Sequence, residues 1–205
     1  MKTTEKDWDM SDVMGSDSKG SKKPKSFWGN VLDVVIWGIS GLAIGLLVVF
    51  FVVQKSEVEG SSMMPNLVDG DTIIVEKVVK HFRSMNRGDI VVISVDKLQD
   101  KSLEYDLVKR VVGLPGETIE IRNGNVIIDG EKLDEPYLSE GTLTFPTVSG
   151  QRELIVTLGE SEYFCLGDNR GNSYDSRGLG PIPHSYFIGR VVLRIFPFSS
   201  FGWVQ

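Results

Sequence analysis

The apolar run VVIWGISGLAIGLLVVFFVV, residues 34–53, determines how the whole chain is organised. It holds 20 residues without a charge, which as a helix is the length needed to cross about 30 Å of hydrocarbon. A helix in the core of a soluble domain seldom stays apolar on every face over such a length. The run therefore predicts a single transmembrane helix, which we place at residues 31–54.

The region before the apolar run is polar, rich in Ser, Asp and Lys, and has no apolar period. We therefore expect residues 1–30 to form a disordered tail. Four lysines lie shortly before the run, whereas only Lys55 lies as close after it. The positive-inside rule then places the tail in the cytoplasm and the rest of the chain outside.

A cleaved secretion signal is the alternative interpretation of this run. The run is longer than the usual apolar region of such signals, and it ends in FFVVQ without a small-x-small cleavage site. We therefore expect an uncleaved anchor in the lipid bilayer of the cytoplasmic membrane.

After the run, residues 55–205 change to short β-branched segments separated by Gly, Asn, Asp and Pro, a pattern typical of an antiparallel β domain. Asn123-Gly124 between two such segments predicts a hairpin, because both residues accept positive φ. No segment here has a sustained helical period. The fold class should be mainly β, with a folded-over antiparallel sheet or partly closed barrel. The expected strands are residues 72–78, 89–95, 106–112, 118–121, 126–128, 154–158, 163–166 and 188–196.

The composition argues against several classes of function. A net charge of −6 is unfavourable for binding nucleic acid. Cys165 is the only cysteine, so the chain has no internal disulfide, and its place in YFCL indicates a buried core residue. His81 and His184 neighbour no Gly-x-Ser-x-Gly and no metal-ligand spacing. We expect no metal, no cofactor and no histidine base.

The stretch GSSMMPNL, residues 60–67, is a candidate nucleophile site a few residues past the apolar run. A serine hydroxyl becomes a useful nucleophile when a base removes its proton and backbone donors await the oxyanion. We interpret Ser62 as a nucleophile held at a membrane surface. An ordinary loop leaving the membrane explains the same stretch.

The stretch YDLVKRVVGLPGE, residues 105–117, contains the best candidate base. By alternation along a strand, either Lys109 or Arg110 must point inward. A buried ammonium loses its hydration, so its pKa falls and the neutral amine becomes a general base. The alternative is a surface lysine beside a surface arginine on an exposed face.

The stretch GDNRGNSYDSRG, residues 167–178, is dense in turn formers, charges and hydroxyls. A calcium loop also alternates acids, but the Asn169-Arg170 pair and the missing closing Glu argue against one. Alternating Asp and Arg suit ion pairs that hold a loop over a site.

Three motifs, SMMP, VKRVVGLPGE and GDNRGNSYDSR, occur in this order after an N-terminal apolar run. In this they closely resemble the bacterial type I signal peptidases, from about residue 58 to residue 198. The resemblance implies a serine endopeptidase that removes signal peptides from secreted preproteins after Ala-x-Ala-type sites, outside the cytoplasmic membrane. It makes Ser62 the nucleophile and Lys109 the general base of a Ser/Lys dyad.

The resemblance also implies roles for supporting residues. Ser173 would orient the lysine amine, Asp175 would pair with Arg177, and Arg110 would pair with Asp168. The side chains that match the family's pocket positions, where core packing is the alternative, are Val58, Met63, Leu67, Leu107 and Val108.

Three positions depart from the family pattern. The Ser62 N–H should supply one oxyanion donor, but Gly60 stands where some members carry a second, hydroxyl donor. Asn66 replaces a usual Thr, and Gly171 replaces an acid found in many members. None of these changes removes a group of the dyad, so we expect activity.

Two other functions compete with this one. A self-cleaving Ser/Lys repressor protease would need a DNA-binding domain in place of the apolar run. An inactive membrane-tethered module that binds signal peptides or export factors would tolerate Ser62→Ala, whereas an enzyme would not.

Overall fold

The computed structural model describes residues 27–78, 84–98, 103–148 and 150–204. The expected tail therefore lies mostly outside the described residues. The chain divides into two compact units, Met1–Ile44 and Gly45–Gln205, which are described separately below.

A single long helix, α1 (Phe27–Val52), covers the apolar run. Its segment Asn30–Leu47 has a mean hydropathy of 1.8 and no buried residue; among the described residues it is the one helical stretch apolar enough to span a membrane. The helix begins at Phe27, four residues before the start expected from the sequence. It ends at Val52 because Val53 pairs with Glu76 as the first residue of a strand.

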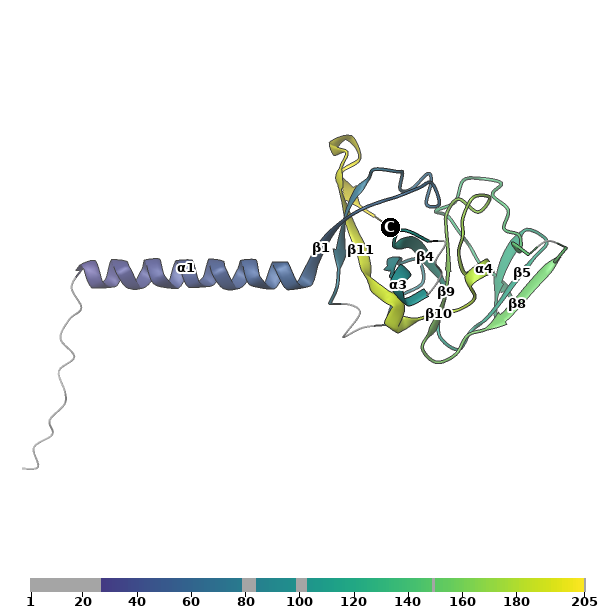
Figure 1. Ribbon diagram of the computed structural model, residues 1–205, viewed down its shortest axis with the longest axis horizontal. Coiled ribbons are helices and arrows are strands. Elements are labelled where there is room, and N and C mark those ends of the chain that lie inside the picture. The colour runs from purple at the N-terminus through teal and green to yellow at the C-terminus, as the bar shows by residue number, and fades with distance from the viewer. Residues whose placement is uncertain (1–26, 79–83, 99–102, 149, 205) are drawn as a thin grey trace, which may run out of the picture. The chain divides into compact units, whose positions relative to one another are not determined.

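The larger unit is built on one antiparallel sheet of eight strands (Figure 1). Seven follow in spatial order β1 (Val53–Glu57), β2 (Thr72–Glu76), β11 (Phe187–Phe196), β3 (Ile90–Ile93), β4 (Leu107–Gly113), β9 (Glu162–Leu166) and β10 (Ile182–Pro183). The eighth, β12 (Gly202–Trp203), pairs with β11. Register shifts in β11 and between β4 and β9 bend this sheet into a half-closed barrel. The mainly β prediction is confirmed.

A second antiparallel sheet of four strands follows β4 in the chain. Its order is β7 (Glu131–Lys132), β6 (Asn125–Ile128), β5 (Thr118–Arg122) and β8 (Glu153–Thr157), and Figure 1 shows β5 and β8 side by side. The predicted hairpin between β5 and β6 is confirmed, since Asn123 and Gly124 have φ of 52° and 78°.

Three apolar clusters form the core. The first includes Val58, Met63 and Leu67 beneath β2, the second lies around Phe187 and Cys165, and the third lies under the smaller sheet. The prediction that Cys165 is a buried core residue is confirmed. Strand β4 runs between these clusters and is buried from its second residue to its last.

Every strand expected from the sequence is present, but several short elements were not predicted. These are β1, β7, β10, β12, the helices α3 (Val95–Leu98) and α4 (Ser176–Leu179), and the 3₁₀ turns η2 (His184–Tyr186) and η3 (Phe198–Ser200). A strand of two residues is too short to show alternation of polar and apolar side chains, and β1 has the polar sequence VQKSE. These strands form because they pair with neighbouring strands, as β1 does with β2.

Candidate active site

The side chains of Ser62 and Lys109 meet although they are 47 residues apart. Lys109 Nζ lies 2.8 Å from Ser62 Oγ. Ser62 is in the tight turns after β1, and Lys109 is in β4. The amine also donates to the carbonyl oxygen of Val108, at 2.9 Å. The site therefore places an amine in position to accept the serine proton.

The surroundings of Lys109 favour its neutral form. Its side chain is 2% exposed. Burial lowers the pKa of Lys109 to about 8, while the charges near it, chiefly Asp175, act in the opposite direction. At pH 7 about a tenth of the amines are then unprotonated, and this fraction rises with pH.

The turn that carries Ser62 is held by the loop that follows β9. Asn169 donates its backbone N–H to the Ser62 carbonyl oxygen at 2.9 Å and its side-chain amide to the Ser61 carbonyl oxygen at 3.1 Å. Within the described part of the chain, the Ser62 N–H has no hydrogen-bond acceptor. That N–H is therefore available as an oxyanion donor.

Ser173 is in the same loop, with its Oγ buried. Among the described residues this oxygen has no hydrogen-bond partner, so the expected contact with the Lys109 amine is not formed in this structure. A Cβ placed on Gly167 would lie 2.2 Å from Ser173 Oγ and 2.5 Å from the Ser62 carbonyl oxygen. The hydroxyl thus lies close to the nucleophile turn, and its role in orienting the amine stays a prediction.

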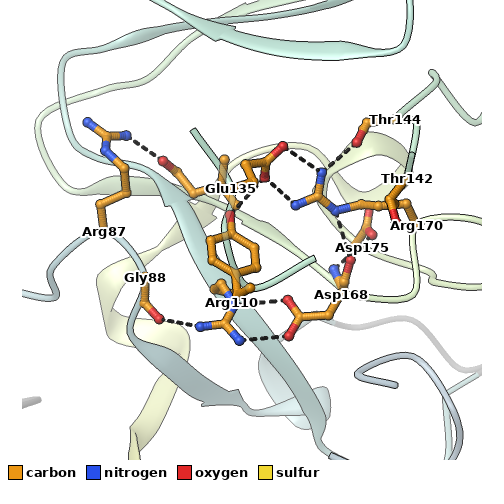
Figure 2. Close-up of polar contacts among 12 residues, drawn as sticks. Arg87, Gly88, Arg110, Glu135, Thr142, Thr144, Asp168, Arg170 and Asp175 are labelled. Atoms are coloured by element: carbon orange, nitrogen blue, oxygen red, sulfur yellow. Dashed lines mark hydrogen bonds and ion pairs between the residues drawn. The ribbon is translucent and has the colours of Figure 1, made fainter. Parts of the chain in front are cut away.

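The ion pair expected between Arg110 and Asp168 is present and buried. Arg110 Nε and Nη2 donate to the two oxygens of Asp168 at 2.9 and 2.7 Å, and Nη1 donates to the Gly88 carbonyl oxygen at 3.0 Å (Figure 2). The guanidinium also lies 4.1 Å from the centre of the Tyr137 ring. The pair joins β4 to the loop after β9 beside the Ser62–Lys109 pair.

The ion pair expected between Asp175 and Arg177 is also present. Arg177 Nε and Nη2 each lie 2.8 Å from an oxygen of Asp175. Asp175 accepts the Gly167 N–H at 3.1 Å, and Arg177 donates to the Arg170 carbonyl oxygen at 2.8 Å. These contacts join the beginning of the loop, at Gly167 and Arg170, to its end at Asp175 and Arg177.

Two groups of supporting contacts were not predicted from the sequence: one joins Arg170, Glu135 and Tyr137, and the other is formed by Asn66. Arg170 is buried, pairs with Glu135 and Thr144 (Figure 2), and donates to the Gly167 carbonyl oxygen at 3.0 Å. Tyr137 OH donates to Glu135 Oε1 at 2.7 Å, and burial raises the pKa of this tyrosine. The motif that contains Arg170 is visible in the sequence, but Glu135 lies 35 residues before Arg170, so no local pattern predicts their pairing.

Asn66 is the second missed group. Its amide Nδ2 lies 2.8 Å from both Asp168 Oδ2 and the Tyr137 carbonyl oxygen. The backbone carbonyl oxygen of Asn66 accepts a hydrogen bond from Arg194 Nη1 at 3.0 Å. Asn66 therefore ties the nucleophile turn to the buried ion pair.

A cavity of about 380 Å³ opens at the Ser62–Lys109 pair. Leu107 and Val108 line it, and their role as substrate-pocket residues stays a prediction. The cavity wall does not include Val58, Met63 and Leu67, which are buried in the first core cluster together with Val108. This cluster also contains Ile73 and Val75 of β2, so the three side chains lie where the core-packing alternative places them.

The described residues offer no group of three or more His, Cys, Asp or Glu that could hold a metal ion. A serine beside an amine base in a β domain fits the class of serine hydrolases.

Comparisons with known proteins agree with that class. Residues 31–196 match the profile of the family described as "Signal peptidase, peptidase S26". The chain is 38% identical over 164 residues to the signal peptidase I of Leptolyngbya laminosa, covering 78% of this chain and 76% of the relative. It is 36% identical over 193 residues to the signal peptidase I of Bacillus amyloliquefaciens, covering 90% and 93%. A solved structure of a signal peptidase I from Enterococcus faecalis is 30% identical, with a TM-score of 0.40, and covers 53% of this chain and 97% of that one.

The chain belongs to the signal peptidase family, peptidase S26. It is an enzyme, a peptidase and hence a hydrolase, as its sequence predicted.

Proposed function

We propose that the chain is a membrane-anchored serine endopeptidase that cleaves signal peptides from secreted preproteins after Ala-x-Ala-type sites. The observation that carries the proposal is the 2.8 Å contact between Ser62 Oγ and the buried Lys109 amine. Membership of the signal peptidase family supports signal peptides as the substrate class.

The reaction follows from the positions of the two side chains. The neutral Lys109 amine takes the proton of Ser62 Oγ as that oxygen attacks the carbonyl carbon before the scissile bond. The Ser62 N–H faces the developing oxyanion. The ammonium then gives the proton to the leaving amine, and the acyl group stays on Ser62. A water then loses a proton to the same amine and attacks the acyl carbon. The bond between Ser62 Oγ and that carbon breaks, and the ammonium returns the proton to Ser62 Oγ.

The loop contacts explain how the site keeps its geometry between steps. The buried pairs Arg110–Asp168 and Asp175–Arg177 fix β4 and the loop after β9. We assign Ser173 as the hydroxyl that orients the amine once substrate is bound, because its Oγ is buried near the nucleophile turn and has no partner in the described structure.

Selectivity for small residues follows from the walls of the cavity. Leu107 and Val108 present apolar surface beside Lys109. Apolar walls close to the catalytic groups leave room for alanine side chains and exclude larger ones.

The helix α1 would anchor this peptidase in the cytoplasmic membrane. The lysines before the helix support an N-terminus inside the cell and a peptidase unit outside it.

The test is cleavage of a preprotein whose signal ends in Ala-x-Ala by the detergent-solubilised protein, with sequencing of the new N-terminus. We expect a cut directly after that motif by the parent and by Ser161→Ala, an exposed serine in a loop before β9 that serves as the matched control. Ser62→Ala should not cut. Cleavage by Ser62→Ala would refute the proposal, and signal binding without cleavage by the parent would favour the inactive binding module.

A further inference from the structure

Stabilising the oxyanion of acyl transfer commonly takes two hydrogen-bond donors, and the site described so far supplies one. Among the described residues, no acceptor binds the Ser62 N–H. Gly60 has no side chain, and its N–H is already held by Asp69 Oδ1 at 2.6 Å. The residue two before the nucleophile therefore has no donor left.

Ser61, next to the nucleophile, has a hydroxyl with an uncommitted hydrogen. Asn172 Nδ2 donates to Ser61 Oγ at 2.9 Å. A serine hydroxyl offers one donor and two lone pairs, so this contact uses a lone pair and leaves the O–H to donate. In the part of the chain that the structure describes, no acceptor receives it.

Both residues line the cavity that contains Ser62 and Lys109. Asn172 is itself held, since its backbone N–H donates to the Asn169 carbonyl oxygen at 2.9 Å. Asn169 in turn binds the carbonyl oxygens of Ser61 and Ser62. One loop thus fixes both the nucleophile turn and the Ser61 hydroxyl before substrate arrives.

We propose that the Ser61 hydroxyl is the second oxyanion donor of this enzyme, and that Asn172 is the positioning residue that aims it. As the Ser62 Oγ–carbon bond forms, negative charge moves to the substrate carbonyl oxygen and the serine proton moves to Lys109 Nζ. The Ser61 O–H donates to that oxygen without giving up its proton. The inference rests on the proposed function.

The test measures kcat and KM for an Ala-x-Ala preprotein at a pH where the parent rate is maximal. Removing one oxyanion donor costs about 10²- to 10³-fold in kcat. We expect such a loss for Ser61→Ala with KM changed less than about threefold, because the donor acts mainly in the transition state. Ser61→Thr, which keeps the hydroxyl, should retain most of the parental kcat.

Asn172→Asp gives an independent measurement. A carboxylate only accepts, so it would turn the Ser61 hydroxyl hydrogen away from the substrate. We expect this variant to lose kcat, and we expect the double variant Ser61→Ala/Asn172→Asp to be no slower than the slower single variant. A merely structural role would lower the melting temperature and give additive losses.

The outcomes separate this inference from the proposed function. Parental kcat in Ser61→Ala or in Asn172→Asp, with an active parent and an inactive Ser62→Ala, would overturn the role of Ser61 and leave the peptidase assignment standing. An inactive parent, or an active Ser62→Ala, would overturn the peptidase assignment itself.

Discussion

Lys109 and Arg110 are neighbours in one strand, and both are buried, with 2% and 1% exposure. Alternation along the strand required at least one of them to point inward, and both are buried because β4 is covered on both faces. The two cations are treated differently: Arg110 is neutralised by the Asp168 carboxylate, whereas Lys109 contacts the uncharged Ser62 hydroxyl and Val108 carbonyl. This difference leaves the lysine as the group that loses its proton.

The pH dependence of catalysis should report the pKa of Lys109. Only the neutral amine accepts the Ser62 proton, so kcat/KM should rise about tenfold per pH unit below pH 8 and level off above it. The measurement is a pH–rate profile on a substrate without groups that titrate in this range. A profile that is flat between pH 6 and 9 would contradict Lys109 as the base.

The same pKa predicts an effect of Lys109→Met on stability. Burial lowers the folded-state pKa to about 8, from the ordinary 10.5, so the unfolded chain binds more protons between these values and parental stability rises with pH across that window. Relative to its difference from the parent above pH 10.5, the variant should be more stable below pH 8 by roughly 3 kcal/mol, and it should be inactive. Above pH 10.5 this advantage should vanish.

Urea denaturation of both proteins at pH 7 and pH 10.5 measures this difference. Lys132→Met, at an exposed position of β7, is the matched control and should show little pH-dependent change. A stability difference between Lys109→Met and the parent that is the same at pH 7 and pH 10.5 would show that burial of the amine carries no such cost.

At the scale of elements, the contact between the loop after β9 and the nucleophile turn depends on Gly167. A Cβ there would come within 2.2 Å of Ser173 Oγ and 2.5 Å of the Ser62 carbonyl oxygen. Gly167→Ala should therefore push the loop from the turn, lower stability by about 1–3 kcal/mol, and reduce kcat/KM.

Gly171 in the same loop is the control, because a Cβ there meets nothing within 4 Å and its φ is not in the left-handed region. The measurements are the melting temperature and kcat/KM of both variants, which we expect to be lowered only in Gly167→Ala. Equal behaviour of Gly167→Ala and Gly171→Ala would mean that the close approach is not needed.

The buried ion pair Arg110–Asp168 should contribute more to the free energy of unfolding than an exposed ion pair does. Asp168→Asn keeps the shape but leaves the buried guanidinium without its counter-charge, so we expect a loss of about 3–5 kcal/mol. Glu153→Gln removes the exposed partner of Arg122, 4.0 Å away, and should change stability by less than about 0.5 kcal/mol. Denaturant midpoints compare the two, and a small effect of Asp168→Asn would show that water or Asn66 compensates the charge.

At the scale of the whole molecule, the proposed membrane attachment rests on α1. The double variant Ile39→Arg/Leu42→Arg places two charges inside the segment Asn30–Leu47, at about 3 kcal/mol each. We expect it to leave the membrane fraction on cell fractionation, whereas Trp28→Arg, outside that segment, should remain. Retention of the double variant would mean that another surface of the protein holds it at the membrane.

Much of the architecture could be predicted from local patterns. The apolar run determined α1, β-branched segments determined the longer strands, and Asn123-Gly124 determined the hairpin between β5 and β6. These features depend on interactions within a few residues of each other, which a sequence displays directly. The short strands could not be found in this way, because β1 and β12 exist only through their pairing partners.

The sequence by itself determined the apolar helix, the antiparallel β class and, through its motifs, the family. Only the tertiary structure decided that Ser62 and Lys109 meet, that Asn66 joins the nucleophile turn to Asp168, and that Val58, Met63 and Leu67 pack in the core instead of lining the cavity. The physical reason is distance along the chain. Contacts between residues 47 or 102 positions apart depend on how the sheet closes, and so does the burial that lowers the pKa of Lys109.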